Sequence, residues 1–355
     1  MANILLTGAS GYLGGSILAQ LHNSGADRIE LPAHGTIYAL VRSDIQAQAV
    51  QDYGAEPAAF DPSNEAAIQS FIVGNEVSIV IWFIDVVNVD RQILFIRALA
   101  KLRQQTGQDV HFLQTSGAKI FSDLAGAPTD RPLLDIDPGL YEIQKKQQDQ
   151  APYQAFQKVD AASGLNSYKK MHRRMVRINK VSQAVATNNT IISLAEEFDV
   201  KSYIIAPCIV YGKGLGFGNL ISAQTVAIVR AAKEAKRVYR VDDNSPSQPW
   251  TRKRGYYLPS PGSIAWDDLY SRMAAALAKK GVVEDERITL ADDEALEAMS
   301  RGLKCPKAFV RVQLAGKCTL TPNNGTESLG WVPNFTPEHI LETAEAEVEL
   351  ILNHI

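Results

Sequence analysis

Three glycines near the start of the sequence have the spacing needed to hold a negatively charged ligand against the backbone. Gly8, Gly11 and Gly14 stand in the segment TGASGYLGG, directly after a short apolar run and at the opening of a helical pattern. The first permits a tight turn, the second lets the backbone approach a pyrophosphate, and the third lets the helix lie close to the sheet with its first N–H groups facing the anion. A tight turn that binds no ligand is the alternative. The predicted contacts to a dinucleotide are Gly8, Ser10, Gly11, Tyr12, Leu13 and Gly14.

The residues after the second predicted strand decide which dinucleotide would fit. An acidic side chain there would bind the ribose 2′-hydroxyl of NAD, but this chain has Arg42 and Ser43 in the segment LVRSD. Because a guanidinium can pair with a 2′-phosphate, the sequence favours NADP; NAD, with Arg42 as a solvated strand end, is the alternative. Asp61, after the third predicted strand, could accept the adenine amino group or cap the helix that begins near Ser63.

The elements that must position these residues are alternating strands and helices. Strands that are apolar throughout and separated by helical patterns are typical of a parallel sheet covered on both faces. We therefore predict an α/β fold, a Rossmann-type doubly wound parallel sheet over 1–212, with a small mixed, mostly helical substrate region over 213–355. A polar insertion of about 118–186 interrupts the first domain, and Thr187 is predicted to cap the helix after it. The predicted strands are 3–8, 35–43, 55–61, 77–85, 109–117 and 201–212.

Composition narrows the class of protein further. The chain has 355 residues, of which 46% are hydrophobic and 21% charged, and its formal net charge is -3. This charge gives no general attraction to nucleic acid, and no run of about 18 apolar residues suggests a membrane span. The three cysteines form neither a disulfide framework nor a metal motif, and the start of the chain lacks a secretory signal. We expect a cytoplasmic protein without a metal site.

Four segments resemble the short-chain dehydrogenase/reductase superfamily in its extended, epimerase-like branch. They are TGASGYLGG at 7–15, LQTSG at 113–117, IIAPCIVYGKG at 204–214 and LGWVP at 329–333, and together they span almost the whole chain. The sequence is most similar to an atypical group of fungal proteins described as NAD-dependent epimerases/dehydratases. It shares with them the segments TSGAK, YEIQKKQ, TNN, GKCTLT and APCIVYGKG followed by GFGN.

The resemblance implies a mechanism for proton and hydride transfer. Thr115 and Ser116 match the residues that orient the substrate carbonyl at the end of the fifth strand, and Pro207 matches a cofactor-contacting residue after the sixth. Tyr141 and Lys145 match a tyrosine that donates the proton and a lysine four residues later. The tyrosine needs that help, because a phenol with a pKa of about 10 is a poor proton relay until a nearby cation favours its ionised form.

A second spacing disagrees with this assignment. Tyr141 lies 25 residues after Ser116, as the resemblance implies. Lys145, however, lies 61 residues before Ala206, which is more than twice too far. Both spacings hold only if 146–186 is a long insertion, and since connections are usually short, the sequence favours the absence of a standard dyad. Tyr141 and Lys145 would then be surface residues, although Tyr141 could still reach the site.

Other polar residues could supply the missing proton or hydrogen bond. Lys119 follows the fifth predicted strand and could be a cationic proton donor, or an ordinary exposed lysine. Asp85 ends the fourth predicted strand, where ligands of such sheets bind, or caps the next helix. Asn188 and Asn189 stand where the atypical relatives keep polar residues, and their alternative role is to cap their own helix.

Two further features belong to the predicted site. Phe83, together with Trp82, could line the nicotinamide side, although buried aromatic residues in strands usually belong to the core. The glycine-rich segment GKGLGFGN at 212–219 corresponds to a loop that the family uses for substrate and phosphate contacts, and a flexible connection is the alternative.

These observations lead to one expected function and two alternatives. We expect an NADP(H)-dependent oxidoreductase that acts on the carbonyl or alcohol of a small organic molecule in specialised metabolism. The first alternative is a non-redox isomerase, cyclase or lyase on the same scaffold, with the dyad lost. The second is a nucleotide-sensing regulator without chemistry. The expected partner is a small-molecule substrate, and we expect no binding to nucleic acid or membrane. Whether the protein forms a homodimer is left open by the sequence.

Overall fold

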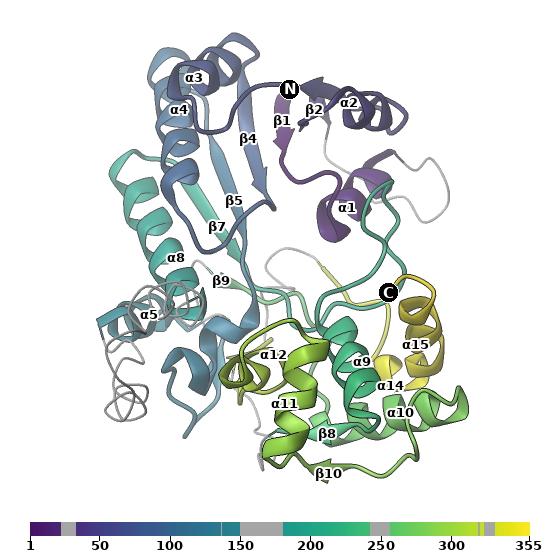
Figure 1. Ribbon diagram of the computed structural model, residues 1–355. Coiled ribbons are helices and arrows are strands. Elements are labelled where there is room, and N and C mark those ends of the chain that lie inside the picture. The colour runs from purple at the N-terminus through teal and green to yellow at the C-terminus, as the bar shows by residue number, and fades with distance from the viewer. Residues whose placement is uncertain (23–32, 136, 150–179, 242–255, 319, 323–330) are drawn as a thin grey trace, which may run out of the picture. The chain divides into compact units, whose positions relative to one another are not determined.

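The computed structural model describes 1–22, 33–135, 137–149, 180–241, 256–318, 320–322 and 331–355, which Figure 1 shows as coloured ribbon. The chain divides into two compact units. The first unit comprises Met1–Ser116, Gln183–Ala206 and Gly214–Leu220, and the second comprises Gly117–Ser182, Pro207–Lys213 and Ile221–Ile355. The boundary near 212 and the extent of the 118–186 insertion stay predictions, and 150–179 lie outside the described residues.

The first unit is built on a parallel sheet. Its strands run in the order β3-β2-β1-β4-β5-β7, and each neighbouring pair is parallel. The order reverses direction between β1 and β4, so the carboxyl ends of these two strands form the switch point where ligands of such sheets bind. This confirms the predicted doubly wound α/β fold. The strands are β1 (Ala2–Leu6), β2 (His34–Leu40), β3 (Glu56–Ala58), β4 (Val77–Trp82), β5 (His111–Thr115) and β7 (Lys201–Ile205).

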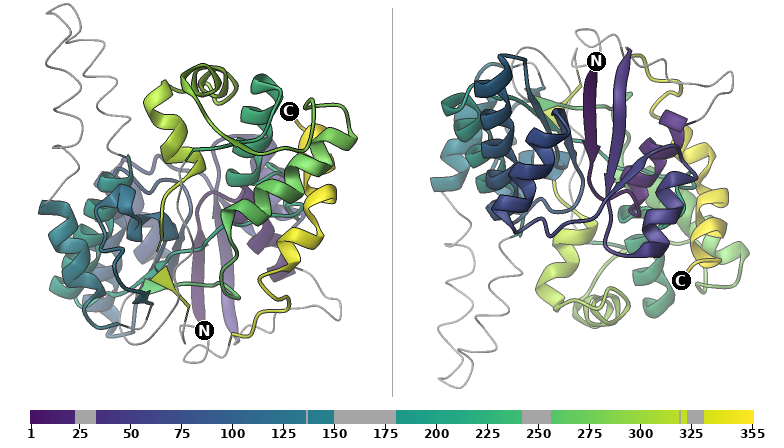
Figure 2. Two further views of the ribbon diagram at one scale, coloured as in Figure 1. Left: turned by 90° about the horizontal axis from the view of Figure 1, so that it is seen from below. Right: turned by 90° about the horizontal axis from the view of Figure 1, so that it is seen from above.

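Helices cover both faces of this sheet. Figures 1 and 2 show α1 and α2 on one side of the strands and α3 and α4 on the other, as right-handed crossovers require. On the first face Leu18 and Val50 pack against strand residues, whereas on the second Trp82 packs against Phe95 and Phe112. The helices are α1 (Tyr12–His22), α2 (Asp44–Gln51), α3 (Glu65–Gly74), α4 (Asp90–Thr106) and α8 (Lys180–Glu197).

The predicted cap at Thr187 is wrong, and so is the cap that was one of the two alternative roles of Asp61. Asn64, not Asp61, caps α3 by accepting the Ala67 N–H, and the Asp61 carboxylate accepts the Ser63 N–H one turn earlier. Thr187 does not begin a helix either, because α8 already starts at Lys180 and Thr187 is buried inside it. The residues before Thr187 include Ala and Val but no Gly or Pro, so nothing in them interrupts the helix.

The second unit is mostly helical. Helix α9 packs against α11, α12 and α15, and α10 packs against α14 and α15. The buried Glu347 carboxylate accepts hydrogen bonds from the Gly212 N–H at 2.8 Å and the Thr225 hydroxyl at 2.6 Å, and so anchors 207–213 to α9 and α15. The helices are α5 (Leu140–Asp149), α9 (Gln224–Ala235), α10 (Trp266–Lys279), α11 (Asp293–Gly302), α12 (Val310–Leu314), α14 (His339–Glu342) and α15 (Ala344–Leu352).

Short strands and 3-10 helices complete the second unit. The strands pair in parallel as β8 with β10 and as β6 with β11. These two pairs are two-stranded sheets, which fits the predicted mixed, mostly helical region. They are η1 (Ala118–Phe121), η2 (Asp123–Ala125), β6 (Leu133–Leu134), β8 (Tyr239–Arg240), β9 (Tyr256–Tyr257), β10 (Thr289–Leu290), η4 (Lys307–Phe309) and β11 (Leu320–Thr321).

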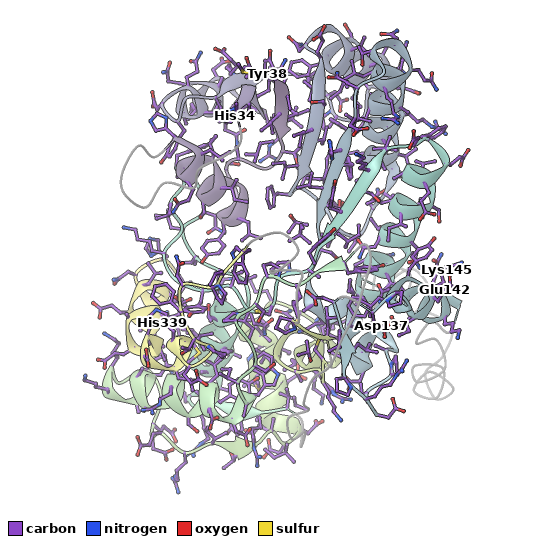
Figure 3. The ribbon with its side chains drawn as sticks, turned by 180° about the vertical axis from the view of Figure 1, so that it is seen from behind. His34, Tyr38, Asp137, Glu142, Lys145 and His339 are labelled. Atoms are coloured by element: carbon purple, nitrogen blue, oxygen red, sulfur yellow. The ribbon has the colours of Figure 1, made fainter. Side chains whose placement is uncertain are left out.

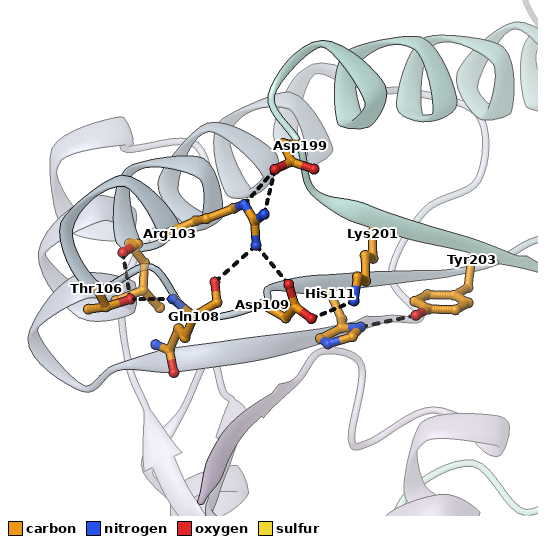
Figure 4. A network of polar contacts seen from close by, with 9 residues as sticks. Arg103, Thr106, Gln108, Asp109, His111, Asp199, Lys201 and Tyr203 are labelled. Atoms are coloured by element: carbon orange, nitrogen blue, oxygen red, sulfur yellow. Dashed lines mark hydrogen bonds and ion pairs between the residues drawn. The ribbon is translucent and has the colours of Figure 1, made fainter.

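A charged network ties together the amino ends of β5 and β7 (Figure 4). Arg103 donates to Asp109 at 2.8 Å and also pairs with Asp199, while Lys201 pairs with the other oxygen of Asp109. Hydrogen bonds from Lys201 and then Arg103 lower the pKa of the Asp109 carboxyl. The network lies at the amino ends of the strands, whereas ligands of open α/β sheets bind at the carboxyl ends, so we expect it to contribute to structure and not to ligand binding. None of the helices in the described ranges has the length and apolar content needed to cross a bilayer.

Candidate functional site

The glycine turn after β1 has the geometry that an anion-binding turn requires. Gly8 adopts a left-handed backbone conformation with φ of 71°, and the Gly11 N–H donates to the Gly8 carbonyl at 2.8 Å. A Cβ on Gly14 would overlap that same carbonyl, so only glycine allows α1 to lie this close to the turn. Helix α1 then begins at Tyr12, and the first N–H groups of a helix have no acceptor within it. The turn therefore presents helix-end donors at the carboxyl end of β1.

A distant segment, 214–220, packs against this turn. The Asn219 N–H donates to the Ser10 carbonyl at 3.0 Å, and the Leu215 N–H donates to the Ser16 hydroxyl at 3.1 Å. Gly218 lies so close to Ser10 that a Cβ there would overlap the Ser10 carbonyl. The glycines of this segment therefore serve close backbone contact with the turn. The family resemblance pointed to the segment, but its position on the turn was not predictable from the sequence.

The end of β2 is joined to the glycine turn by one glutamine. Gln46 donates from Nε2 to the Ser10 hydroxyl at 3.2 Å and accepts the Arg42 main-chain N–H at 2.9 Å. The Ser43 hydroxyl caps α2 by accepting the Gln46 N–H at 3.3 Å. Arg42 itself is exposed. Sequence reasoning missed Gln46, although Ser43 and Gln46 form the Ser-x-x-Gln pattern of a capping box, which could have indicated it.

The residues at the carboxyl end of β4 and just after it have two roles: some contact the glycine turn, and others belong to the core. The Phe83 N–H donates to the Thr7 hydroxyl at 3.0 Å, and the Phe83 Cβ lies beside Gly8. Trp82 is fully buried, and its indole N–H donates to the Asp85 carbonyl at 3.0 Å. The Asp85 carboxylate accepts the Val87 N–H at 2.8 Å, so it closes a turn and does not cap α4. Trp82 is therefore core, whereas Phe83 lies against the predicted site.

Ser116, at the carboxyl end of β5, has a partner on α8. Its N–H donates to the Ile205 carbonyl at 2.7 Å, which fixes its backbone to β7. Asn188 donates from Nδ2 to the Ser116 hydroxyl oxygen at 3.0 Å. Asn188 and Asn189 lie within α8, so neither caps it, and the alternative role proposed for them is wrong. Thr115, the last residue of β5, is buried.

The remaining predicted residues belong to the second unit. Lys119 donates from Nζ to the Val312 carbonyl at 2.7 Å and the Gln313 carbonyl at 3.4 Å. Burial lowers the pKa of the Lys119 amine to about 8, and the nearby Cys318 and Asp123 partly oppose this shift. Lys119 is therefore not the ordinary exposed lysine of the alternative reading, because its amine is held by the end of α12.

Tyr141 and Lys145 lie one turn apart on α5. The Lys145 amine lies 5.1 Å from the centre of the Tyr141 ring. It also lies 3.3 Å from the carboxylate of Glu142, and Figure 3 labels Lys145 and Glu142 on this helix. The Lys145 cation thus contacts the face of the ring and a neighbouring carboxylate. Pro207 accepts the Ala118 N–H through its carbonyl at 2.9 Å. Ser116 and Thr115 belong to the first unit and these residues to the second, so the catalytic role of Tyr141, Lys145 and Lys119 stays a prediction.

The residues of the first unit fit a dinucleotide. The left-handed Gly8, the close approach of Gly14 and the start of α1 have the geometry that a cradle for a pyrophosphate needs. The exposed Arg42 stands at the end of β2, where a ribose would bind, and Gln46 links it to the cradle. Within the described parts of the chain, no group of three or more His, Cys, Asp and Glu side chains could hold a metal ion.

Comparison with known proteins supports the fold. No protein-family model matches the sequence, and no curated protein matches it either. Among solved structures, the chain is similar to the terminal R domain from the myxalamid PKS-NRPS biosynthetic pathway, with 13% identity, a TM-score of 0.57, and 100% of this chain and 92% of that chain covered. It is also similar to the Bordetella bronchiseptica enzyme WbmH in complex with NAD+, with 14% identity, a TM-score of 0.55 and coverage of 100% and 99%. A third is the leucoanthocyanidin reductase–NADPH complex from Vitis vinifera, with 14% identity, a TM-score of 0.51 and coverage of 99% and 100%. These similarities show a shared Rossmann-type fold.

Proposed function

We propose that this chain is an NADP(H)-dependent oxidoreductase of the extended short-chain dehydrogenase/reductase type, acting on the carbonyl or alcohol of a small organic molecule. The observation that carries the proposal is the glycine turn, in which Gly8, Gly11 and Gly14 place the start of α1 at the switch point of the sheet. Two of the similar structures hold NAD+ or NADPH, and a third comes from a biosynthetic pathway, which supports a nicotinamide cofactor and specialised metabolism.

The choice of NADP over NAD rests on the end of β2. Arg42 is exposed there, and its main-chain N–H is fixed by Gln46, which in turn contacts Ser10 in the glycine turn. The first residue of α2 is Asp44, beyond the Ser43 cap, so Arg42 is the charged side chain at the strand end itself. A guanidinium at this point can bind a 2′-phosphate through charge-assisted hydrogen bonds.

The chemistry that a bound nicotinamide supplies is hydride transfer to or from the carbon of the substrate carbonyl. Ser116 is the residue proposed to hold the carbonyl oxygen, because its backbone is fixed to β7 and its hydroxyl can donate a hydrogen bond. Proton supply is proposed to come from Tyr141, or from Lys119, whose amine has a pKa of about 8 and can exchange a proton near neutral pH.

One observation favours a second candidate, a non-redox enzyme on the same scaffold. Helix α8 leads directly into β7, where the resemblance places the tyrosine and lysine of the dyad, yet the side chain that α8 offers to Ser116 is the amide of Asn188. An amide can donate a hydrogen bond but does not exchange a proton at neutral pH. An isomerase, cyclase or lyase that uses Ser116 and Asn188 only as hydrogen-bonding groups would suit this arrangement.

Nucleotide binding and hydride transfer separate these candidates. The protein is titrated with NADPH and with NADH, and binding is measured from the change in protein fluorescence. NADPH should bind more tightly than NADH. Arg42→Ala should weaken NADPH binding by about 10- to 100-fold, the loss of one charged hydrogen-bonding group, and leave NADH nearly unchanged. Arg97→Ala, which removes an exposed arginine from α4, is the matched control and should change neither.

Single-turnover oxidation of bound NADPH with a panel of small aldehydes and ketones then tests the reaction. Loss of the NADPH absorbance with at least one carbonyl supports the oxidoreductase. Binding of NADPH without hydride loss on any of them would favour the non-redox enzyme. Absence of binding to both nucleotides would contradict the proposal as a whole.

A further inference from the structure

Asn188 is a buried polar residue whose side chain donates a hydrogen bond to a predicted catalytic residue, Ser116. It lies in the middle of α8, and its side chain is fully buried. Its Nδ2 donates to the Ser116 hydroxyl at 3.0 Å, while its Oδ1 is buried and has no hydrogen-bond partner among the described residues. Of the two polar atoms of this amide, Nδ2 therefore has a partner in Ser116, and Oδ1 has none among the described residues.

This arrangement is unfavourable for stability. A buried acceptor without a donor costs about 1–3 kcal/mol. Asn is also a poorer residue than Ala or Leu in a helix interior, because its side chain competes for backbone hydrogen bonds. Buried amide oxygens without a partner also occur at Gln92 and Gln114 among the described residues, so what distinguishes Asn188 is the group to which it donates. Because the Asn188 side chain donates to Ser116, we look for the role of Asn188 in the orientation of the Ser116 hydroxyl.

We propose that Asn188 is a positioning residue that keeps the Ser116 hydroxyl in the donor state. Because the amide N–H donates to the hydroxyl oxygen, one acceptor position of that oxygen is filled from the α8 side. The hydroxyl proton is then free to point elsewhere, toward the oxygen of a bound carbonyl. The Ser116 backbone cannot turn away, since its N–H is held by Ile205. This inference rests on the proposed function, in which Ser116 binds the substrate oxygen.

The proposal makes Asn188→Asp an informative substitution. The carboxyl group has nearly the same shape, and burial raises its pKa above the usual value for Asp. In its neutral form it can still donate to Ser116. In its ionised form it can only accept a hydrogen bond. The Ser116 hydroxyl then donates to this carboxylate and no longer to the substrate. The rate should therefore fall as pH rises through the pKa of the new carboxyl group.

The first arm of the test measures the pH profile of single-turnover hydride transfer. In Asn188→Asp, loss of one donor to a developing oxyanion should lower the rate by about 100-fold above that pKa, with recovery at lower pH, while NADPH affinity stays unchanged. Asn188→Ala should be slow at every pH, which covers the case that the carboxyl variant does not fold. Gln92→Glu places a carboxyl at another fully buried amide with an unpaired oxygen and should show no such profile.

A rate for Asn188→Asp within threefold of the wild type, with a flat pH profile, would overturn the positioning role. So would a pH step of equal size in Gln92→Glu, because the effect would then come from any buried charge.

The second arm is independent of activity. Urea unfolding of Asn188→Ala, Ser116→Ala and the double variant gives the coupling between the two residues. The hydrogen bond should appear as about a fivefold coupling in the unfolding equilibrium constant, and a value near one would refute the contact. If the wild type transfers no hydride, the proposed function and the positioning role fail together, whereas the coupling still decides whether Asn188 and Ser116 interact.

Discussion

Replacing Lys119 by methionine should change how the stability of the protein depends on pH. The Lys119 amine donates to the Val312 and Gln313 carbonyls at the end of α12, and burial lowers its pKa from 10.5 to about 8. This displacement means that the charged amine is disfavoured in the folded state by about 3 kcal/mol relative to the unfolded state. Methionine has a similar length and carries no charge, so it removes this free-energy cost.

The sign and the pH window follow from the two pKa values. Below pH 8 the amine is protonated in both states, and the wild type carries the full cost. Between 8 and 10.5 only the unfolded state keeps the proton, so the wild type gains stability as pH rises. Between about pH 7 and about pH 9.5, the wild type should gain about 2 kcal/mol relative to Lys119→Met.

Urea unfolding of both proteins at these two pH values measures the effect. Methionine cannot make the hydrogen bonds to Val312 and Gln313, and this loss lowers the stability of the variant at both pH values. The quantity to compare is therefore how much the difference in unfolding free energy between wild type and variant changes between the two pH values. Lys233→Met, which removes an exposed lysine of α9, is the control and should show a difference constant to within about 0.5 kcal/mol. If the difference in unfolding free energy between wild type and Lys119→Met does not change with pH, the amine does not have the lowered pKa that its burial implies.

Three further substitutions test other parts of the structure. Gly14→Ala should lower the free energy of unfolding by about 1–3 kcal/mol and abolish NADPH binding, because its Cβ overlaps the Gly8 carbonyl, whereas Gly74→Ala, with open space around its Cβ, should be neutral in both assays. Glu347→Gln should lower the unfolding free energy by about 1–3 kcal/mol in urea, since an amide cannot accept both hydrogen bonds that the buried carboxylate accepts. Burial lowers the pKa of His111, so the folded state takes up its proton less readily, and the wild type should lose stability below about pH 6.5; in His111→Gln this loss should shrink, and an unchanged pH dependence in urea would contradict the assignment.

The sequence alone was sufficient to predict the sheet and the glycine turn after its first strand. Apolar strand runs, glycine spacing and helix patterns are local signals, and they predicted the parallel strands, the helices between them and the turn at Gly8. The errors fell on helix starts. Thr187 was expected to cap a helix that resumes after the polar insertion, but α8 already starts at Lys180 and buries Thr187 within it.

The family resemblance led to Ser116 and Tyr141, but only the tertiary structure shows what surrounds each predicted residue. Asn188 meets Ser116 across a sequence separation of 72 residues, and Gln46 meets Ser10 across 36. No periodicity encodes such contacts, because they depend on how α8 and α2 lie over the sheet.

The sequence by itself therefore determined the type of fold and the position of the glycine turn after β1, since both follow from backbone preferences over a few neighbouring positions. The tertiary structure decided which polar groups act on one another. It placed Asn188 on the Ser116 hydroxyl, Asn219 on the glycine turn and the Lys119 amine on the carbonyls of α12. The physical reason is that a hydrogen bond needs its two atoms within about 3 Å, a condition that packing of distant segments sets and that local sequence does not.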